Sequence, residues 1–208
     1  MEITIIGTGN MARGIATRAL AGGHAVTLLG TGAEKAQGLA DELRGDVRAG
    51  PVGDPLAGEL VVLAIWYPDA VNDVLAKYGD QLDGKVIVDI PNPIDTASFE
   101  PLRIEAGSVA QEVAAKPPGA KVVKAFNTTF AGPLAEGQVA GQTLDVFVAA
   151  DDEEAKSTVK QVAEDGGLRP IDAGPLARAR ELEALGFQHM ALQESLGTGY
   201  GSTVKVLA

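Results

Sequence analysis

The residues best spaced for chemistry lie at the start of the chain and would bind an anion. The β-branched run 3–6 (ITII) leads into Gly7, Gly9 and Ala12 at the spacing G-x-G-x-x-A, and apolar residues at helical spacing follow. This order predicts a strand, a glycine turn and a helix, the form that binds dinucleotides. Gly7 permits the turn, Gly9 lets a pyrophosphate approach, and Ala12 lets the helix pack on the sheet. The alternative is a glycine turn that binds nothing.

A second strand is predicted at 24–29 (HAVTLL), and the residues after it distinguish NAD from NADP. A carboxylate there would bind the ribose diol and repel a 2′-phosphate. The segment 29–32 reads Leu-Gly-Thr-Gly and has no carboxylate. The hydroxyl of Thr31 and the charge of Lys35 therefore favour NADP. The alternatives are a helix-capping Thr31 and an ordinary solvated Lys35.

Loops that follow later strands are the candidate walls of a cleft, because ligands bind at the carboxyl ends of parallel strands. Trp66 and Phe126 offer apolar planes for a flat ring, and Asn92 and Asn127 offer amides for a carboxamide or ring edge. The alternatives are core packing for Trp66 and strand termination for the prolines. The loops themselves are Ile65, Trp66 and Tyr67, then Pro91, Asn92 and Pro93, then Phe126, Asn127, Thr128 and Thr129.

Groups for acid–base or metal chemistry are few in the sequence. There is no cysteine, no G-x-S-x-G motif and no set of residues with metal-ligand spacing. We expect His24 and His189 to be structural, and Asp89 and Asp172 to end strands or cap turns. We therefore predict no catalytic side chain and no metal. Hydride transfer between two stacked rings needs neither.

Alternating strand and helix patterns predict the architecture. Apolar runs such as 60–65 (LVVLAI) and 85–90 (KVIVDI) are typical of buried parallel strands. A helix is expected from Ser108 to Ala115, ended by Pro117-Pro118-Gly119, and a long last helix from Pro175. The pattern predicts an α/β Rossmann-type, doubly wound, mostly parallel sheet. We expect one domain over 1–208, with a dinucleotide-binding core of about 1–145 and a small C-terminal α/β extension of about 146–208.

Composition limits the partners. The chain has 208 residues, 46% of them hydrophobic, and a net charge of -11. The acidic balance argues against nucleic acid and anionic membranes as partners. No apolar run is long enough for a membrane span, and the first strand begins at once, so we expect no signal peptide and a cytoplasmic protein.

Five segments together resemble the coenzyme F420-dependent NADP oxidoreductase family. They are IIGTGNMARGIA (5–16), GHAVTLLG (23–30), VVKAFNT (122–128), DVFVAADDEEAK (145–156) and LRPIDAGPLARARELE (168–183). The KAFNT segment is also similar to the cytosolic reductase domain of the six-transmembrane metalloreductases, which use NADPH and a flavin.

The resemblance implies hydride transfer between NADPH and C5 of a deazaflavin, in a protein that is often a homodimer. It implies that Thr8, Gly9, Asn10 and Met11 hold the pyrophosphate and ribose, and that Thr31 and Lys35 meet the 2′-phosphate. Asn127, with its neighbours Ala125 and Thr128, would line the deazaflavin side.

The chain departs from the family pattern at two positions. The family usually has serine or threonine followed by arginine where this chain has Gly30-Thr31, and the archaeal enzymes carry a histidine near the position of Asn127. Coenzyme F420, a flavin and a small imine or carbonyl substrate therefore remain alternatives for the second substrate. A non-enzymatic NADP sensor is a further alternative.

Overall fold

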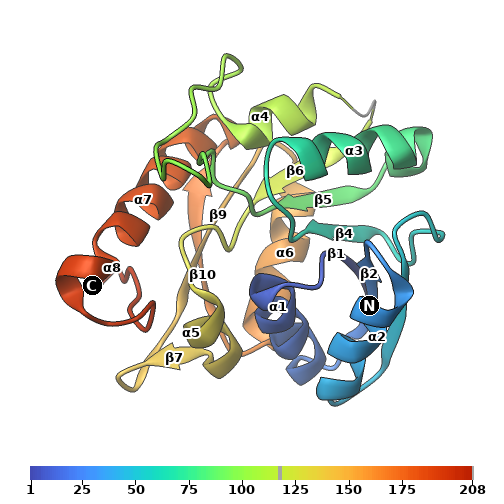
Figure 1. Cartoon of the computed structure of the whole chain (residues 1–208), viewed down its shortest axis with the longest axis horizontal. Coiled ribbons are helices and arrows are strands. Elements are labelled where there is room, and N and C mark those ends of the chain that lie inside the picture. Colours follow the sequence, from blue (N-terminus) through green and yellow to red (C-terminus); the bar gives the residue numbers. More distant parts are fainter. Residues whose placement is uncertain (117–118, 208) are drawn as a thin grey trace.

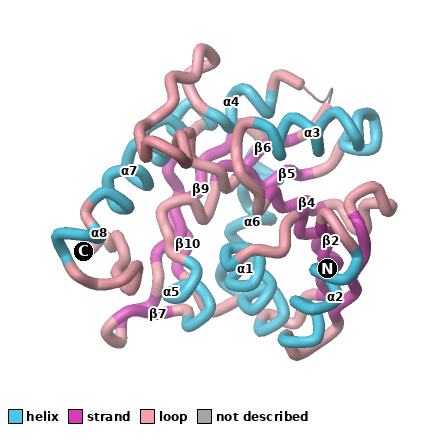
Figure 2. The backbone as a smooth tube through the Cα atoms, viewed as in Figure 1, coloured by secondary structure: helices cyan, strands magenta, loops and turns pink. Residues whose placement is uncertain are grey.

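The computed structural model describes residues 1–116 and 119–207, and the predicted helix stop at Pro117-Pro118 lies outside them. Eight strands form one sheet in the order β10-β9-β6-β5-β4-β1-β2-β3. Figure 2 shows this sheet as a magenta band running between the helices. The strands are β1 Glu2–Ile6, β2 Ala25–Gly30, β3 Val47–Pro51, β4 Leu60–Leu63, β5 Val86–Asp89, β6 Lys121–Lys124, β9 Asp145–Ala150 and β10 Arg169–Gly174.

The sheet confirms the predicted Rossmann-type, mostly parallel architecture. β1 lies between β2 and β4 and is parallel to both, with Ile5 opposite Leu28 and Val62. Only the pairing of β6 with β9 is antiparallel among the strands of this sheet. β10 is an edge strand, a position that suits Pro170 because proline cannot donate a ladder hydrogen bond. Because β9 and β10 belong to the same sheet, residues after 145 continue the core.

Helices cover both faces of the sheet, as Figure 1 shows. One core joins Ile3, Ile5 and their neighbours to α1, α2, α5 and α6. The other joins Ile6, Leu63 and their neighbours to α3, α4 and the start of α7. The helices are α1 Asn10–Ala21, α2 Ala33–Glu42, α3 Asp69–Tyr78, α4 Val109–Ala114, α5 Ala131–Glu136, α6 Glu153–Asp165, α7 Ala179–Ala191 and α8 Gln193–Leu196, with 3-10 turns at Gly79–Leu82 and Leu176–Arg178.

Side chains cap the starts of two helices, and the first of them confirms the helix start predicted at Ser108. Ser108 Oγ accepts a hydrogen bond from the Gln111 N–H, and Asp152 accepts one from the Ala155 N–H. The last helix differs from its prediction. It begins at Ala179 after a 3-10 turn, and it ends at Ala191 before the short α8.

The short helix α5 and the hairpin of β7 Gln138–Val139 with β8 Gln142–Thr143 were not predicted. Their sequence, AGPLAEGQVAGQT, is too short and too glycine-rich to show a clear period. α5 packs on α1, where a Cβ at Gly14 would lie 3.1 Å from the Ala131 carbonyl oxygen. This packing places the start of α5 beside the glycine loop. No helix in the described part of the chain is long and apolar enough to cross a membrane.

Candidate functional site

The glycine loop has the geometry that a pyrophosphate requires. Gly7 has φ +126°, and a Cβ there would lie 2.2 Å from the Ala64 carbonyl oxygen, so only glycine fits. At Gly9 the position of a Cβ has no atom within 4 Å. Gly9 is the N-cap of α1, with no side-chain cap and no acidic residue in the first turn. The N–H groups of this first turn therefore face an open space that suits an anion.

The tip of β2 lies against this loop. A Cβ at Gly30 would lie 2.8 Å from the Cγ2 atom of Thr8, so the small residue allows the two to pack together. Thr31 and Lys35 are both exposed beyond this tip. The N-cap of α2 is Gly32 and has no side-chain hydrogen bond, so Thr31 does not act as the helix cap. Their assignment to a 2′-phosphate stays a prediction.

A cleft of about 720 Å³ runs from the glycine loop across the carboxyl ends of β4, β5 and β6. It lies at the edge of the sheet where α/β proteins bind ligands, and its size is that of a small-molecule site. Its lining is mostly apolar and, among the described residues, contains no Asp, Glu, His, Lys or Arg. The lining residues are Gly9, Asn10, Met11, Ala64, Ile65, Trp66, Ile90, Pro91, Asn92, Ile94, Asn127, Thr129, Phe130, Ala131, Gly132, Met190, Gly199 and Tyr200.

The structure brings most of the predicted wall residues together. Ile65, Trp66, Asn92 and Asn127 all line the cleft, although they come from three separate loops. Trp66 is 69% exposed, so its ring is available to a ligand rather than packed in the core.

Other predicted wall residues lie behind the surface of the cleft. Ala125 and Phe126 are buried in the core, so Phe126 does not offer the plane expected of it. Thr128 is buried, and its carbonyl oxygen faces the Nδ1 atom of His189 at 3.2 Å. Pro93 is half-buried outside the lining. These residues support the wall from behind.

Tyr67 also points away from the cleft. Its hydroxyl donates a hydrogen bond of 2.7 Å to Glu112 Oε2 on α4. Burial and this bond raise the pKa of Tyr67 to about 12. The hydroxyl therefore stays protonated and serves to tie the loop to α4.

Asn92 and Asn127 bind each other rather than standing apart. Asn127 Nδ2 donates to Asn92 Oδ1 at 2.9 Å and to the Leu182 carbonyl at 2.8 Å, and Asn92 Nδ2 donates to the Asn127 carbonyl at 3.1 Å. A Cβ at Gly186 would lie 2.8 Å from the Asn127 carbonyl oxygen, so glycine lets α7 pack on this pair. Asn127 Oδ1 is buried and has no partner within the described residues. The pair therefore joins two wall loops to α7.

A buried charged cluster underlies the same wall. Lys124 Nζ lies 2.7 Å from Asp89 Oδ2 and 2.9 Å from Glu183 Oε1, and it also donates to the Pro91 carbonyl. Glu183 in turn accepts hydrogen bonds from the Val109 and Ala110 N–H groups. Burial raises the pKa of Asp89 to about 6; Lys124 opposes this shift and Glu183 adds to it. The cluster fixes the loop at Pro91 while keeping its charges out of the cleft.

Nine lining residues are not among those predicted from the sequence: Ala64, Ile90, Ile94, Phe130, Ala131, Gly132, Met190, Gly199 and Tyr200. The glycine-rich segment 197–201 carries no motif that predicts a role. Lys205, which follows this segment, binds Asp145 Oδ1 at 2.9 Å and the Thr143 carbonyl at 2.8 Å. The only signal for this wall was the unusual glycine content near an aromatic residue.

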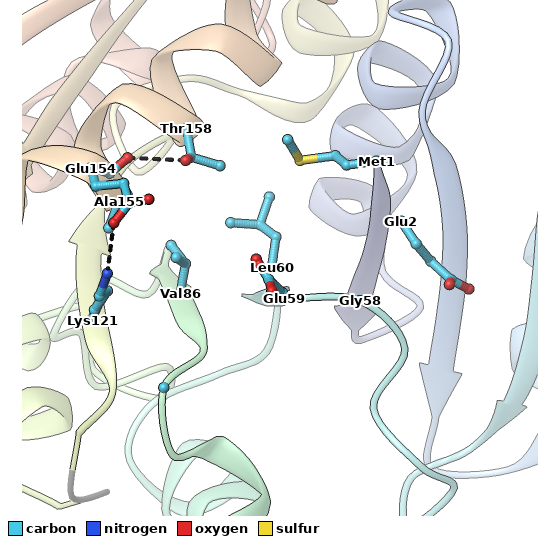
Figure 3. A pocket seen from close by; sticks show the side chains of 11 residues that line it. Met1, Glu2, Gly58, Glu59, Leu60, Val86, Lys121, Glu154, Ala155 and Thr158 are labelled. Atoms are coloured by element: carbon cyan, nitrogen blue, oxygen red, sulfur yellow. Dashed lines mark hydrogen bonds and ion pairs between the residues drawn. The ribbon is translucent and has the colours of Figure 1, made fainter.

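A second hollow, shown in Figure 3, lies at the opposite edge of the sheet near Met1, Leu60 and Val86. Its volume is about 320 Å³. Lys121 faces Glu154 at its rim, where the two form an ion pair of 3.2 Å. This hollow lies at the amino ends of the parallel strands, away from the glycine loop. It is therefore separate from the cleft.

The sheet order and the glycine loop are those of a dinucleotide-binding Rossmann protein. Within the described residues no group of three His, Cys, Asp or Glu side chains could hold a metal ion. The family model described as "NADP oxidoreductase coenzyme F420-dependent" matches residues 2–93.

Known proteins that are similar to this chain include F420-dependent NADP reductases. The F420-dependent NADP reductase of Methanothermobacter thermautotrophicus is 30% identical over 89% of this chain and 86% of its own. The metalloreductase STEAP3 of Rattus norvegicus is 32% identical over 88% of this chain, but the chain spans only 36% of that protein. A crystal structure of a candidate F420-dependent NADP reductase from Arthrobacter sp. FB24 superposes with a TM-score of 0.85, at 28% identity, over 99% of both chains. The chain therefore belongs to the family of coenzyme F420-dependent NADP oxidoreductases.

Proposed function

We propose that the protein transfers a hydride between NADPH and a flat tricyclic second substrate, a deazaflavin of the coenzyme F420 type or a flavin. The observation that carries this proposal is the composition of the cleft. It begins at an anion-binding glycine loop and continues as an apolar, partly aromatic space whose described lining holds no Asp, Glu, His, Lys or Arg.

The chain's own residues divide the work between binding and orientation. Gly9, Asn10 and Met11 would hold the pyrophosphate and ribose, and Thr31 and Lys35 would meet the 2′-phosphate. Ile65, Trp66, Asn92 and Asn127 would flank the two rings. NADPH, when bound, supplies the hydride. The apolar lining excludes water and keeps the rings in contact, which is what this reaction needs from a protein.

A deazaflavin or flavin suits this lining better than a small carbonyl compound. Reduction of a carbonyl group produces an alkoxide that must receive a proton, and the described lining offers one phenol, Tyr200, and the hydroxyl of Thr129 for that purpose. A reduced tricyclic ring spreads its charge over several heteroatoms and takes a proton from solvent. The names of the relatives from Methanothermobacter and Arthrobacter agree with a deazaflavin.

The test is NADPH oxidation, followed by absorbance, with F420 and then FMN or FAD as the acceptor, repeated with NADH. We expect turnover with F420 or flavin, and weaker activity with NADH. Turnover only with an imine or carbonyl compound would overturn the choice of second substrate. Tight NADPH binding with no turnover on any acceptor would instead indicate a sensor. We also propose that the protein is cytoplasmic and forms a homodimer. Size-exclusion chromatography with light scattering would test the dimer.

A further inference from the structure

The turn formed by residues 198–201 supplies one wall of the cleft, although it lies far along the chain from the glycine loop. Gly199 and Tyr200 both line the cleft, and Tyr200 is 50% exposed. The Tyr200 ring meets the Phe130 ring edge to face, with centroids 5.1 Å apart. A large aromatic residue thus stays half uncovered at the wall of a cleft that the exposed Trp66 also lines.

The backbone of this turn is strained at the tyrosine. The Gly201 N–H donates to the Thr198 carbonyl at 2.9 Å and closes the turn. Its two central residues, Gly199 and Tyr200, have φ +55° and +64°. Glycine and asparagine are the residues that favour these positions, and a bulky side chain there is uncommon. Such strain is characteristic of binding sites, where a side chain is held in place for a ligand.

Hydrogen bonds from α7 and α8 hold the turn in this position. Gln193 is buried; it accepts from Thr198 Oγ1 at 2.6 Å and donates to Ser202 Oγ at 2.9 Å. His189 Nε2 lies 2.8 Å from Ser202 Oγ, and its ring stacks on Phe130 at 4.2 Å. Since His189 Nδ1 faces the Thr128 carbonyl, Nδ1 carries the proton and Nε2 accepts from Ser202.

The chain beyond the turn is fixed as well. Lys205 Nζ and the Val206 N–H bind the two carboxylate oxygens of Asp145 at 2.9 and 2.8 Å, and Arg169 pairs with the same carboxylate. Burial opposes ionisation of Asp145, but these hydrogen bonds outweigh it and lower its pKa to about 2. The segment after α8, red in Figure 1, therefore returns to the sheet and is anchored on both sides of the turn.

We propose that Tyr200 is a binding contact that selects a flat tricyclic ring as the second substrate, with Gln193 and His189 as the residues that position it. The inference rests on the proposed function, since it names the residue that would meet the second ring. The exposed part of the Tyr200 ring and the exposed Trp66 give the site apolar planes of the size that a flavin or deazaflavin covers. A small acyclic imine would leave one of these planes uncovered.

The decisive variant is Tyr200→Gly, because glycine accepts φ +64° without strain and the fold is expected to be retained or stabilised. We expect the KM for F420 or FMN to rise about tenfold, the range of a lost aromatic contact. The Kd for NADPH, measured through the fluorescence of Trp66, should change less than about twofold. Tyr200→Phe should restore most of the lost affinity.

The chain offers a matched control at Phe99. Phe99 is also an aromatic residue with positive φ, +58°, and is partly exposed, but it lies outside the cleft lining. Phe99→Gly should leave the KM for F420 or FMN and the Kd for NADPH at their wild-type values. A change in KM equal to that of Tyr200→Gly would show that relief of backbone strain, rather than loss of the ring, causes the effect.

The positioning role of Gln193 has a separate readout. Gln193→Ala should raise the KM for the second substrate and leave kcat nearly unchanged. Combined with Tyr200→Gly it should add little, because both changes remove the same contact. Fully additive effects would remove Gln193 from this role.

The outcomes separate the two proposals. A wild-type protein that neither binds nor reduces F420 or FMN overturns the proposed function, and the role of Tyr200 with it. A wild-type protein that reduces either acceptor, together with Tyr200→Gly at an unchanged KM, overturns the role of Tyr200 alone.

Discussion

The two ends of the cleft are built in different ways. The glycine loop comes from one continuous stretch, β1 to α1, and presents backbone N–H groups. The opposite end comes from the loops after β5 and β6, from α7 and from the turn at Tyr200, and it presents side chains. A phosphate is alike in every dinucleotide, so backbone alone can bind it. A second substrate has no such common group, and side chains from distant segments can change independently to suit it.

The largest effects should come from two glycines of the loop, which have opposite roles. Gly9→Val should lower NADPH affinity on the order of 100-fold, because its side chain would enter the pyrophosphate space. Stability should change by no more than about 1 kcal/mol, since the space around Gly9 is open.

Gly7→Ala is the matched variant. Its Cβ would meet the Ala64 carbonyl oxygen at 2.2 Å in a positive-φ conformation, and we expect a loss of roughly 2–6 kcal/mol of stability. Fluorescence titration with NADPH and urea unfolding of both variants check the pair. Wild-type NADPH affinity in Gly9→Val would show that the loop does not bind the pyrophosphate.

The contrast between the two ends of the cleft also explains which parts of the structure could be predicted from the sequence. The glycine loop and the buried strands follow local rules of period and turn chemistry, and the structure confirms the architecture they predict. Asn127 was expected to offer its amide to a ligand, but its Nδ2 atom is used by Asn92 and Leu182. No local pattern shows that Leu182, far along the chain, lies beside residue 127. The wall at Tyr200 was missed for the same reason, since its position depends on the tertiary contacts of His189 and Gln193.

The second largest effect concerns the buried charges of Lys124, Asp89 and Glu183, which lie beneath the loop at Pro91. The pKa of Asp89 is raised to about 6 in the folded protein, above its usual 3.8, so the folded state binds more protons than the unfolded state between these values. This contribution to stability is complete below about pH 4 and is lost as the pH rises through 6. The wild type should therefore lose roughly 3 kcal/mol relative to Asp89→Asn between pH 4 and 7.

Urea unfolding of both proteins across this pH range measures the difference. His189 titrates in both and its contribution cancels in the comparison. Parallel curves would mean that Asp89 keeps an ordinary pKa despite its burial beside Lys124.

A smaller effect is expected where α7 packs on the asparagine pair. In Gly186→Ala the new Cβ would lie 2.8 Å from the Asn127 carbonyl oxygen and 2.9 Å from Asn92 Nδ2. Overpacking should cost about 1–3 kcal/mol, partly offset by the better helix propensity of alanine. The KM for the second substrate should rise and the NADPH affinity should stay unchanged. Only the loops of Asn92 and Asn127 would move, and the glycine loop would not.

Gly38→Ala on α2 provides the control. A Cβ at Gly38 has no atom within 4 Å, and Gly38 is an exposed helical position, so alanine should stabilise the protein by about 1 kcal/mol. Thermal unfolding and steady-state kinetics of both variants separate packing from propensity. Equal stabilisation of the two would show that the asparagine pair does not need the glycine.

The smallest effect tests whether the phosphate end uses any side chain. Lys35 is exposed beyond the tip of β2, where water and salt weaken its attraction for a 2′-phosphate. Lys35→Ala should weaken NADPH binding only roughly threefold to fivefold and leave NADH binding unchanged. The loss should shrink as salt is added, whereas Lys77→Ala on α3 should alter neither. Equal losses for both nucleotides would mean that Lys35 does not meet the 2′-phosphate. The preference for NADP would then depend on the backbone and on Thr31, and the phosphate end would be built without charged side chains.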